Sequence, residues 1–160
     1  MNLSLLAPPA SLVDSLIGQR SIRTDWSVRG AVAHVGVAQW LTIDAVLDNI
    51  HAVENVDGDQ FVAARAIRLR QLGWDANASH PERGRGPVGW PPRDAHLELA
   101  LTDGDLEFIR DCLDRNLATT RFLIDSLPVD HRSRAEQEES LRLELAALDV
   151  LDAIQPDPPA

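Results

Sequence analysis

Lysine and tyrosine are both absent from this chain of 160 residues, and all fifteen basic residues are arginine. Acidic residues number 25, so the formal net charge is −10. A surface of that sign disfavours nucleic acid as a partner, because phosphate recognition needs basic side chains. The same charge keeps a small protein in solution and can steer it toward basic partners.

Cysteine is nearly absent, and long apolar runs are missing. Cys112 is the single cysteine, so no internal disulfide can form, which fits a reducing compartment. No run approaches the roughly 18 apolar residues that a membrane span needs. Met1 to Ala10 also lacks the basic segment and long apolar run of a secretory signal. We therefore expect a soluble, cytoplasmic protein without membrane contact.

The chain has enough apolar side chains for one core, since 44% of its residues are hydrophobic. A domain of this length buries about 68–70% of the surface that the unfolded chain exposes. Neither a disulfide nor a metal is needed to explain folding, and we expect no cofactor. We predict one domain over residues 1–160, with a loose leader at 1–9 and a tail at 155–160. We detect no internal repeat in the sequence.

Apolar residues recur at helical spacing over most of the chain, which predicts a mainly α fold. Ala10 to Gln19 forms one short amphipathic segment. Val28 to Asn55 also has helical spacing, but glycines and β-branched residues leave a strand as the alternative for its first part. Phe61 to Gly73 is the third predicted helix, and we place its end at the glycine.

A helical hairpin is predicted for the C-terminal third, residues 103–154. His96 to Thr102 alternates apolar and polar residues, as a short strand does, and Thr102 with Asp105 forms a capping box. A short connection joins two helices with apolar stripes, which indicates antiparallel packing. The predicted fold is a small helical bundle closed by this hairpin, with α+β as the alternative. The stripe of the last helix is Leu141, Leu145, Leu148, Leu151 and Ile154.

Residues 74–95 form the one unusual region, which we predict as a loop rich in proline and glycine. Loops longer than about 12–15 residues are uncommon in compact domains and are often functional. Tryptophan and arginine are over-represented among the residues that dominate protein interfaces. We interpret this loop as a candidate interaction surface, and the alternative is that its tryptophans pack back onto the core. The candidate residues are Trp74, Arg83, Arg85 and Trp90.

The stretch Trp26-Ser27-Val28-Arg29, followed by Ala33-His34, resembles part of the DinB-like helical-bundle family. The resemblance covers about nine residues and implies a four-helix bundle that binds a divalent metal through histidines. His34 would be the matching ligand, often for thiol-linked transferase chemistry, and neutral imidazole suits zinc or nickel. The later His-x-x-x-His pair of that family is missing here. The other histidines stand alone: His51, His80, His96 and His131.

The spacing Arg29-x-x-x-x-His34 also resembles that of HEPN-type ribonucleases, and that resemblance implies RNA bound at a dimer interface. The net acidity of the chain disfavours this interpretation.

No other group of residues has the pattern of a catalytic site. Cys112 lies in an acidic helix, where a reactive thiolate is disfavoured, and we interpret it as a small buried apolar residue. Gly84, Gly86 and Gly89 have the spacing of a dinucleotide fingerprint without its strand–helix context. We predict no catalytic residue, and no metal ligand beyond the weak candidate His34.

Three functions are consistent with these observations. The first is a non-enzymatic, acidic, helical regulatory protein that binds another protein through the central loop or the acidic hairpin. The second is a divergent DinB-like metal enzyme that uses His34. The third is a helical homo-oligomer with a structural role.

Overall fold

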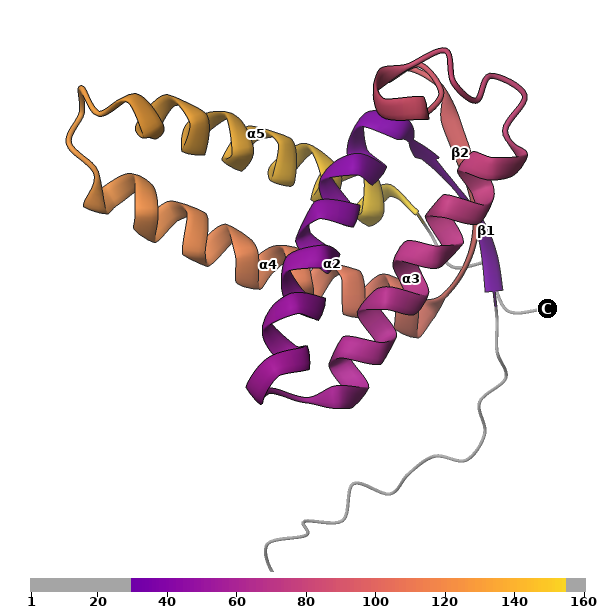
Figure 1. Ribbon diagram of the computed structural model, residues 1–160, viewed down its shortest axis with the longest axis horizontal. Coiled ribbons are helices and arrows are strands. Elements are labelled where there is room, and N and C mark those ends of the chain that lie inside the picture. Colours follow the sequence, from indigo (N-terminus) through magenta and orange to yellow (C-terminus); the bar gives the residue numbers. More distant parts are fainter. Residues whose placement is uncertain (1–29, 155–160) are drawn as a thin grey trace, which may run out of the picture.

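The computed structural model describes residues 30–154, and within them the fold is mainly α with a small antiparallel sheet, as predicted (Figure 1). The predicted helix at Ala10 to Gln19, the leader at 1–9 and the tail at 155–160 lie outside the described residues. The elements, in chain order, are β1 (Gly30–Gly36), α2 (Val37–Asp57), α3 (Gln60–Ser79), the 3₁₀ turn η2 (Pro87–Gly89), β2 (His96–Thr102), α4 (Asp103–Ser126) and α5 (Arg132–Ala153).

The described chain consists of two consecutive strand–helix–helix units, β1-α2-α3 and β2-α4-α5. The two strands pair antiparallel, and Ala33 stands opposite Leu99, which is 66 positions later (99 − 33). The same offset of 66 relates buried residues of the first unit to buried residues of the second. The pairs are Ala33 and Leu99, Val35 and Leu101, Trp40 and Leu106, Ile43 and Ile109, Val46 and Cys112, and Leu47 and Leu113.

The prediction of no internal repeat concerns the sequence, whereas what recurs here is the order of the elements and the spacing of buried positions. The offset maps each strand onto its partner, so the two strands are related by an approximate two-fold axis through the Ala33–Leu99 pair. The second helix of each unit does not follow this relation, because α5 packs against α2 whereas α3 packs against β2. The sequence hides this relation because only Ile43 with Ile109 and Leu47 with Leu113 are identical among the six pairs. What repeats is the spacing of buried positions, which depends on geometry and tolerates different apolar side chains.

The first part of the segment Val28 to Asn55 that the structure describes is a strand, β1, which is the alternative left open by the sequence. In β1, Ala33 and Val35 are buried while Val32 and His34 are exposed, which is the alternation of a half-buried strand. The helix begins only at Val37, whose backbone N–H donates to the Ala95 carbonyl at 2.8 Å. Tertiary contacts thus satisfy a donor that would otherwise be unpaired at the helix start.

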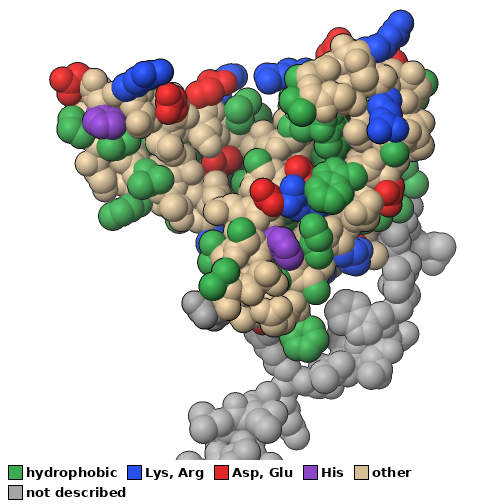
Figure 2. Space-filling view, in the orientation of Figure 1, with side chains coloured by type: hydrophobic (Ala, Val, Ile, Leu, Met, Phe, Trp, Pro, Cys, Tyr) green, Lys and Arg blue, Asp and Glu red, His purple; other side chains and the backbone are tan. Residues whose placement is uncertain are grey.

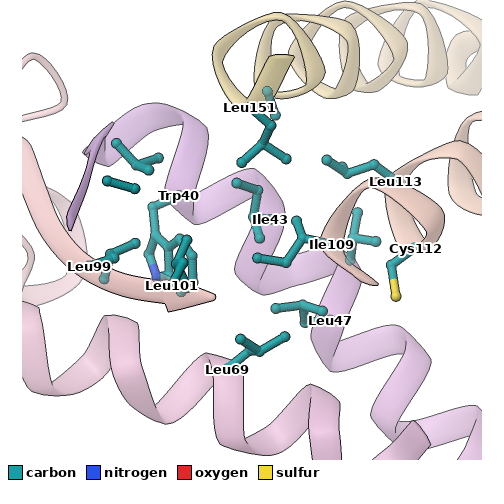
Figure 3. Packing of buried hydrophobic residues seen from close by; sticks show 14 of the residues in the cluster. Trp40, Ile43, Leu47, Leu69, Leu99, Leu101, Ile109, Cys112, Leu113 and Leu151 are labelled. Carbon is teal, nitrogen blue, oxygen red and sulfur yellow. The ribbon is translucent and has the colours of Figure 1, made fainter. Parts of the chain in front are cut away.

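The core lies between the sheet and the helices (Figure 3). Alternate residues of β2 point inward, where α2, α3 and α4 pack against the strand. The predicted capping box is present at the start of α4, and the apolar stripe predicted for the first helix of the hairpin is confirmed. Its residues, all buried in α4, are Leu106, Ile109, Leu113, Leu117, Thr120 and Ile124. Asp105 and Cys112 are buried in α4 as well.

Helix α3 does not end at Gly73, as predicted, but continues to Ser79. Gly73 is buried within the helix, and a Cβ at this position would overlap the indole of Trp40. The glycine is therefore a site of close helix packing rather than a helix end. As a result, the irregular connection covers residues 80–95 and not 74–95.

Helices α4 and α5 form the predicted antiparallel hairpin, and its far part extends beyond the rest of the molecule (Figure 1). We call residues 117–145 the arm. The predicted stripe of α5 is only partly right: Leu151 is buried, but Leu145 is 39% exposed. Glu144 and Ala147 are buried instead.

The carboxylate of Glu144 is almost fully buried in the arm and accepts hydrogen bonds from two hydroxyl groups. Thr120 Oγ1 of α4 donates at 3.2 Å, and Ser140 Oγ of α5 donates at 2.8 Å. Hydrogen bonds of this kind offset the cost of burying a polar group, so a glutamate can occupy the seam.

None of the helices within residues 30–154 combines the length and apolar character needed to cross a membrane.

The contact between Gly73 and Trp40 predicts an unusual response to mutation. Alanine favours a helix over glycine by about 1 kcal/mol, yet we expect Gly73→Ala to lower the free energy of unfolding by about 1–3 kcal/mol, because the core would be overpacked. Urea denaturation followed by circular dichroism measures the change. In a Trp40→Leu background the same substitution should cost much less, and a stabilising Gly73→Ala would contradict the packing described.

Candidate functional site

The two predicted interface tryptophans do not point into solvent. Trp90 is 9% exposed and belongs to the core, and its carbonyl accepts a hydrogen bond from the Gly86 backbone at 2.7 Å. Trp74 lies on α3 and is half-buried, with the Arg70 guanidinium 4.8 Å from its ring centroid. Both tryptophans therefore pack against the body of the protein, which is the alternative left open by the sequence.

Arg83 and Arg85 remain exposed on the 80–95 connection, and Arg85 pairs with Glu82 at 3.1 Å. Val88 is also exposed there, at 97%, and has a φ of 54°. A β-branched residue in this conformation is strained. The hypothesis that this loop binds a partner therefore depends on the two arginines and Val88, because the tryptophans are not available for contact.

His34 lies on the outer face of β1, opposite Glu98, and its Nδ1 is 4.0 Å from Glu98 Oε1. The DinB-like resemblance implied a helical position for this histidine, and a strand position does not match it. Within residues 30–154, no group of three or more His, Cys, Asp or Glu residues has the geometry to hold a metal ion. Arg29, the other residue of the ribonuclease spacing, lies outside the described residues.

Cys112 is buried in α4, and burial raises the pKa of its thiol to about 11. A thiol with that pKa is almost entirely protonated near neutral pH, and the thiolate is the nucleophilic form. The position of Cys112 fits the interpretation as a small apolar residue of the core.

A cleft between α3 and the start of α4 contains a charged cluster that the sequence analysis did not single out. Its lining includes Arg65 and Arg68 of α3, with Thr102 and Asp105 where β2 passes into α4. Asp105 is 2% exposed, Arg68 donates to its Oδ1, and Arg65 Nη2 is 3.5 Å from the same oxygen. Asp105 Oδ2 accepts the Thr102 backbone N–H at 3.2 Å, so one carboxylate joins three elements.

Burial alone would raise the pKa of Asp105, but hydrogen bonds with Thr102 and Arg68 outweigh burial and hold the pKa below its usual value. The carboxylate therefore stays ionised beside the two guanidinium groups at neutral pH. Two signals of this cluster were present in the sequence: the high arginine content of the third predicted helix and the acid of the capping box. Only the fold brings them together.

The arm carries the other unusual surface. Phe122 and Val129 are 69% and 86% exposed. Leu123, which follows Phe122 on α4, and Leu145 of α5 are partly exposed. In Figure 2, charged side chains gather along the α5 edge of the arm, and few lie along its α4 edge. Large exposed apolar side chains on a projecting element are typical of interaction surfaces.

Comparisons with known proteins found no matching family model, no matching curated protein and no matching solved structure.

The buried thiol leads to a prediction about reactivity. At pH 8 a pKa of about 11 leaves on the order of 0.1% of Cys112 as thiolate. We expect Cys112 of the native protein to react with 5,5′-dithiobis(2-nitrobenzoate) about 100-fold more slowly than Cys112 of the protein unfolded in 6 M urea. Fast modification of the native protein would contradict this environment. The chain has one cysteine, so the absorbance signal has a single source.

The ionised Asp105 leads to a prediction about pH. Because its folded pKa is below the unfolded value, its contribution to stability is present above about pH 4 and is lost as pH falls through the folded pKa. We expect Asp105→Asn to lower the free energy of unfolding by about 1.5–3 kcal/mol at pH 7, with a smaller difference at pH 3. Urea denaturation at both pH values measures it.

Asp103→Asn is the matched control, because Asp103 is exposed in the same helical turn. Its loss should be about 0.5 kcal/mol. Equal losses for the two variants would show that the cluster around Asp105 does not stabilise the fold.

Proposed function

We propose that this protein is a non-enzymatic, acidic, helical interaction protein that binds another protein along the α4 edge of the arm. The observation that carries the proposal is the exposure of Phe122 and Val129 on an element that extends away from the core. Contiguous exposed apolar surface on a protein often marks a binding site.

The arm suits a helical partner. Two antiparallel helices leave a groove between them and at their edges, and an amphipathic helix can bury its apolar face there. The net charge of −10 favours a partner that carries basic residues beside that apolar face. Nucleic acid is disfavoured by the same charge.

A cytoplasmic location forms part of the proposal, since a single cysteine fits a reducing compartment. A structural homo-oligomer, in which the arm of a second copy takes the place of the partner, is the second candidate. Its supporting observation is the same exposed apolar surface of the arm.

The test compares two exposed phenylalanines on different elements. Phe122 lies on the arm at 69% exposure, and Phe61 lies at the start of α3 at 89%. A photo-crosslinking amino acid placed at Ser126, at the exposed end of α4, identifies the protein bound to the arm in an extract of the native host. We expect Phe122→Ser to weaken binding of that purified partner about tenfold or more, and Phe61→Ser to leave it unchanged.

Equal effects of the two substitutions, or none from Phe122→Ser, would remove the arm from the interaction. Light scattering over a range of concentrations distinguishes the second candidate. A dimer mass that Phe122→Ser converts to a monomer mass would favour the homo-oligomer over a different partner.

A further inference from the structure

The cleft at the start of α4 lies away from the exposed apolar side chains of the arm. Phe122 follows Asp105 by 17 positions (122 − 105) in the same helix, so the two residues are about 26 Å apart along its axis. The cleft has a volume of about 530 Å³ and is open to solvent on the side of Arg65 and Arg68, whose side chains are 40% and 51% exposed. A ligand bound there would not contact the surface proposed for the protein partner.

The cleft holds an excess of positive charge in an otherwise acidic protein. Arg65 and Arg68 share the single carboxylate of Asp105. Every other ion-paired arginine within residues 30–154 has a carboxylate of its own, and Arg70 has two, from Asp44 and Asp48. Asp103 is not among the residues that line the cleft. The cluster therefore carries a net charge of about +1.

The two guanidinium groups are held in place before any ligand arrives. The Arg65 guanidinium lies 4.8 Å from the ring centroid of Phe108, in the geometry of a cation–π contact. A Cβ on Gly104 would come within 3.1 Å of Arg65 Nη2, so the glycine leaves room for this placement. Arg68 is fixed by its bond to Asp105. Each guanidinium has five N–H donors, and most remain available to a ligand.

We propose that this cleft is a binding site for a carboxylate group, which the free N–H donors of Arg65 and Arg68 recognise. Charge favours a carboxylate over phosphate: one negative charge neutralises the surplus, whereas a phosphate dianion would leave an excess of negative charge beside Asp105. Planar guanidinium groups also match the geometry of a carboxylate. Ala64 adds a small apolar wall against which the carbon next to the carboxylate can pack.

The carboxylate could belong to a free small acid or to the C-terminus of a peptide, and the experiment separates these sources. The probes are sodium acetate, N-acetyl-trialanine with a free carboxyl group, the same peptide as its C-terminal amide, and inorganic phosphate. All are titrated into the full-length protein at constant ionic strength. The arginine Nε–H resonances in ¹H–¹⁵N spectra report binding, and the variants assign the signals of Arg65 and Arg68.

We expect saturable shifts of the Arg65 and Arg68 signals with the acid peptide or with acetate. The amide should give none, and phosphate should bind more weakly than the carboxylate. Arg68→Gln should weaken carboxylate binding about tenfold or more, and Arg65→Gln should do the same. Arg93→Gln, which removes an exposed arginine of the 80–95 connection, should have no effect. Circular dichroism checks that each variant is folded.

Much tighter binding of the acid peptide than of acetate would assign the site to a peptide C-terminus, and equal binding would assign it to a free acid. Either result supports the carboxylate site. Three results would overturn it: absence of saturation with both carboxylates, equal binding of acid and amide, or tighter binding of phosphate. Because the arm is distant, the outcome is independent of the proposed protein partner.

Discussion

The antiparallel pairing of β1 and β2 is the contact on which the rest of the structure depends. Ala33 and Leu99 meet at its centre, and each strand passes directly into a helix. The direction of a strand therefore sets the direction of the helix that follows it. Since the two strands are related by an approximate two-fold axis, α2 and α4 are brought to the same face of the sheet. A two-stranded sheet has little stability alone, and the helices supply the apolar cover that it needs.

The two units differ in how their helices are used. In the first, Gly73 lets α3 approach the Trp40 indole closely, so the hairpin packs against the body of the protein. In the second, α4 and α5 are each longer than their counterparts and extend past the core. Within the arm only the two helices face each other, which leaves a narrow seam. A polar contact between Thr120 and Glu144 occupies part of that seam, and the remaining apolar side chains stay exposed.

The charge of the protein is unevenly distributed despite its large negative sum. Most ion pairs of the described residues lie at the surface, where they contribute little to stability. The pair of arginines around Asp105 is different, because the carboxylate is buried and joins α3 to the junction of β2 and α4. The same contact stabilises the fold and leaves donors facing the cleft. A structural ion pair and a ligand site can therefore share residues.

The sequence by itself determined the mainly helical character, the strand from His96 to Thr102 and the buried face of α4, because these follow from local periodicity and capping. Local patterns could not show that Gly73 is a packing site or that α5 buries Glu144, since the partner helix supplies the reason in each case. The two-fold relation of the strands and the arginine cleft were also decided only by the tertiary structure. Both depend on contacts between residues that are far apart in the chain. Such contacts require side chains of complementary shape and charge, which no local sequence pattern reveals.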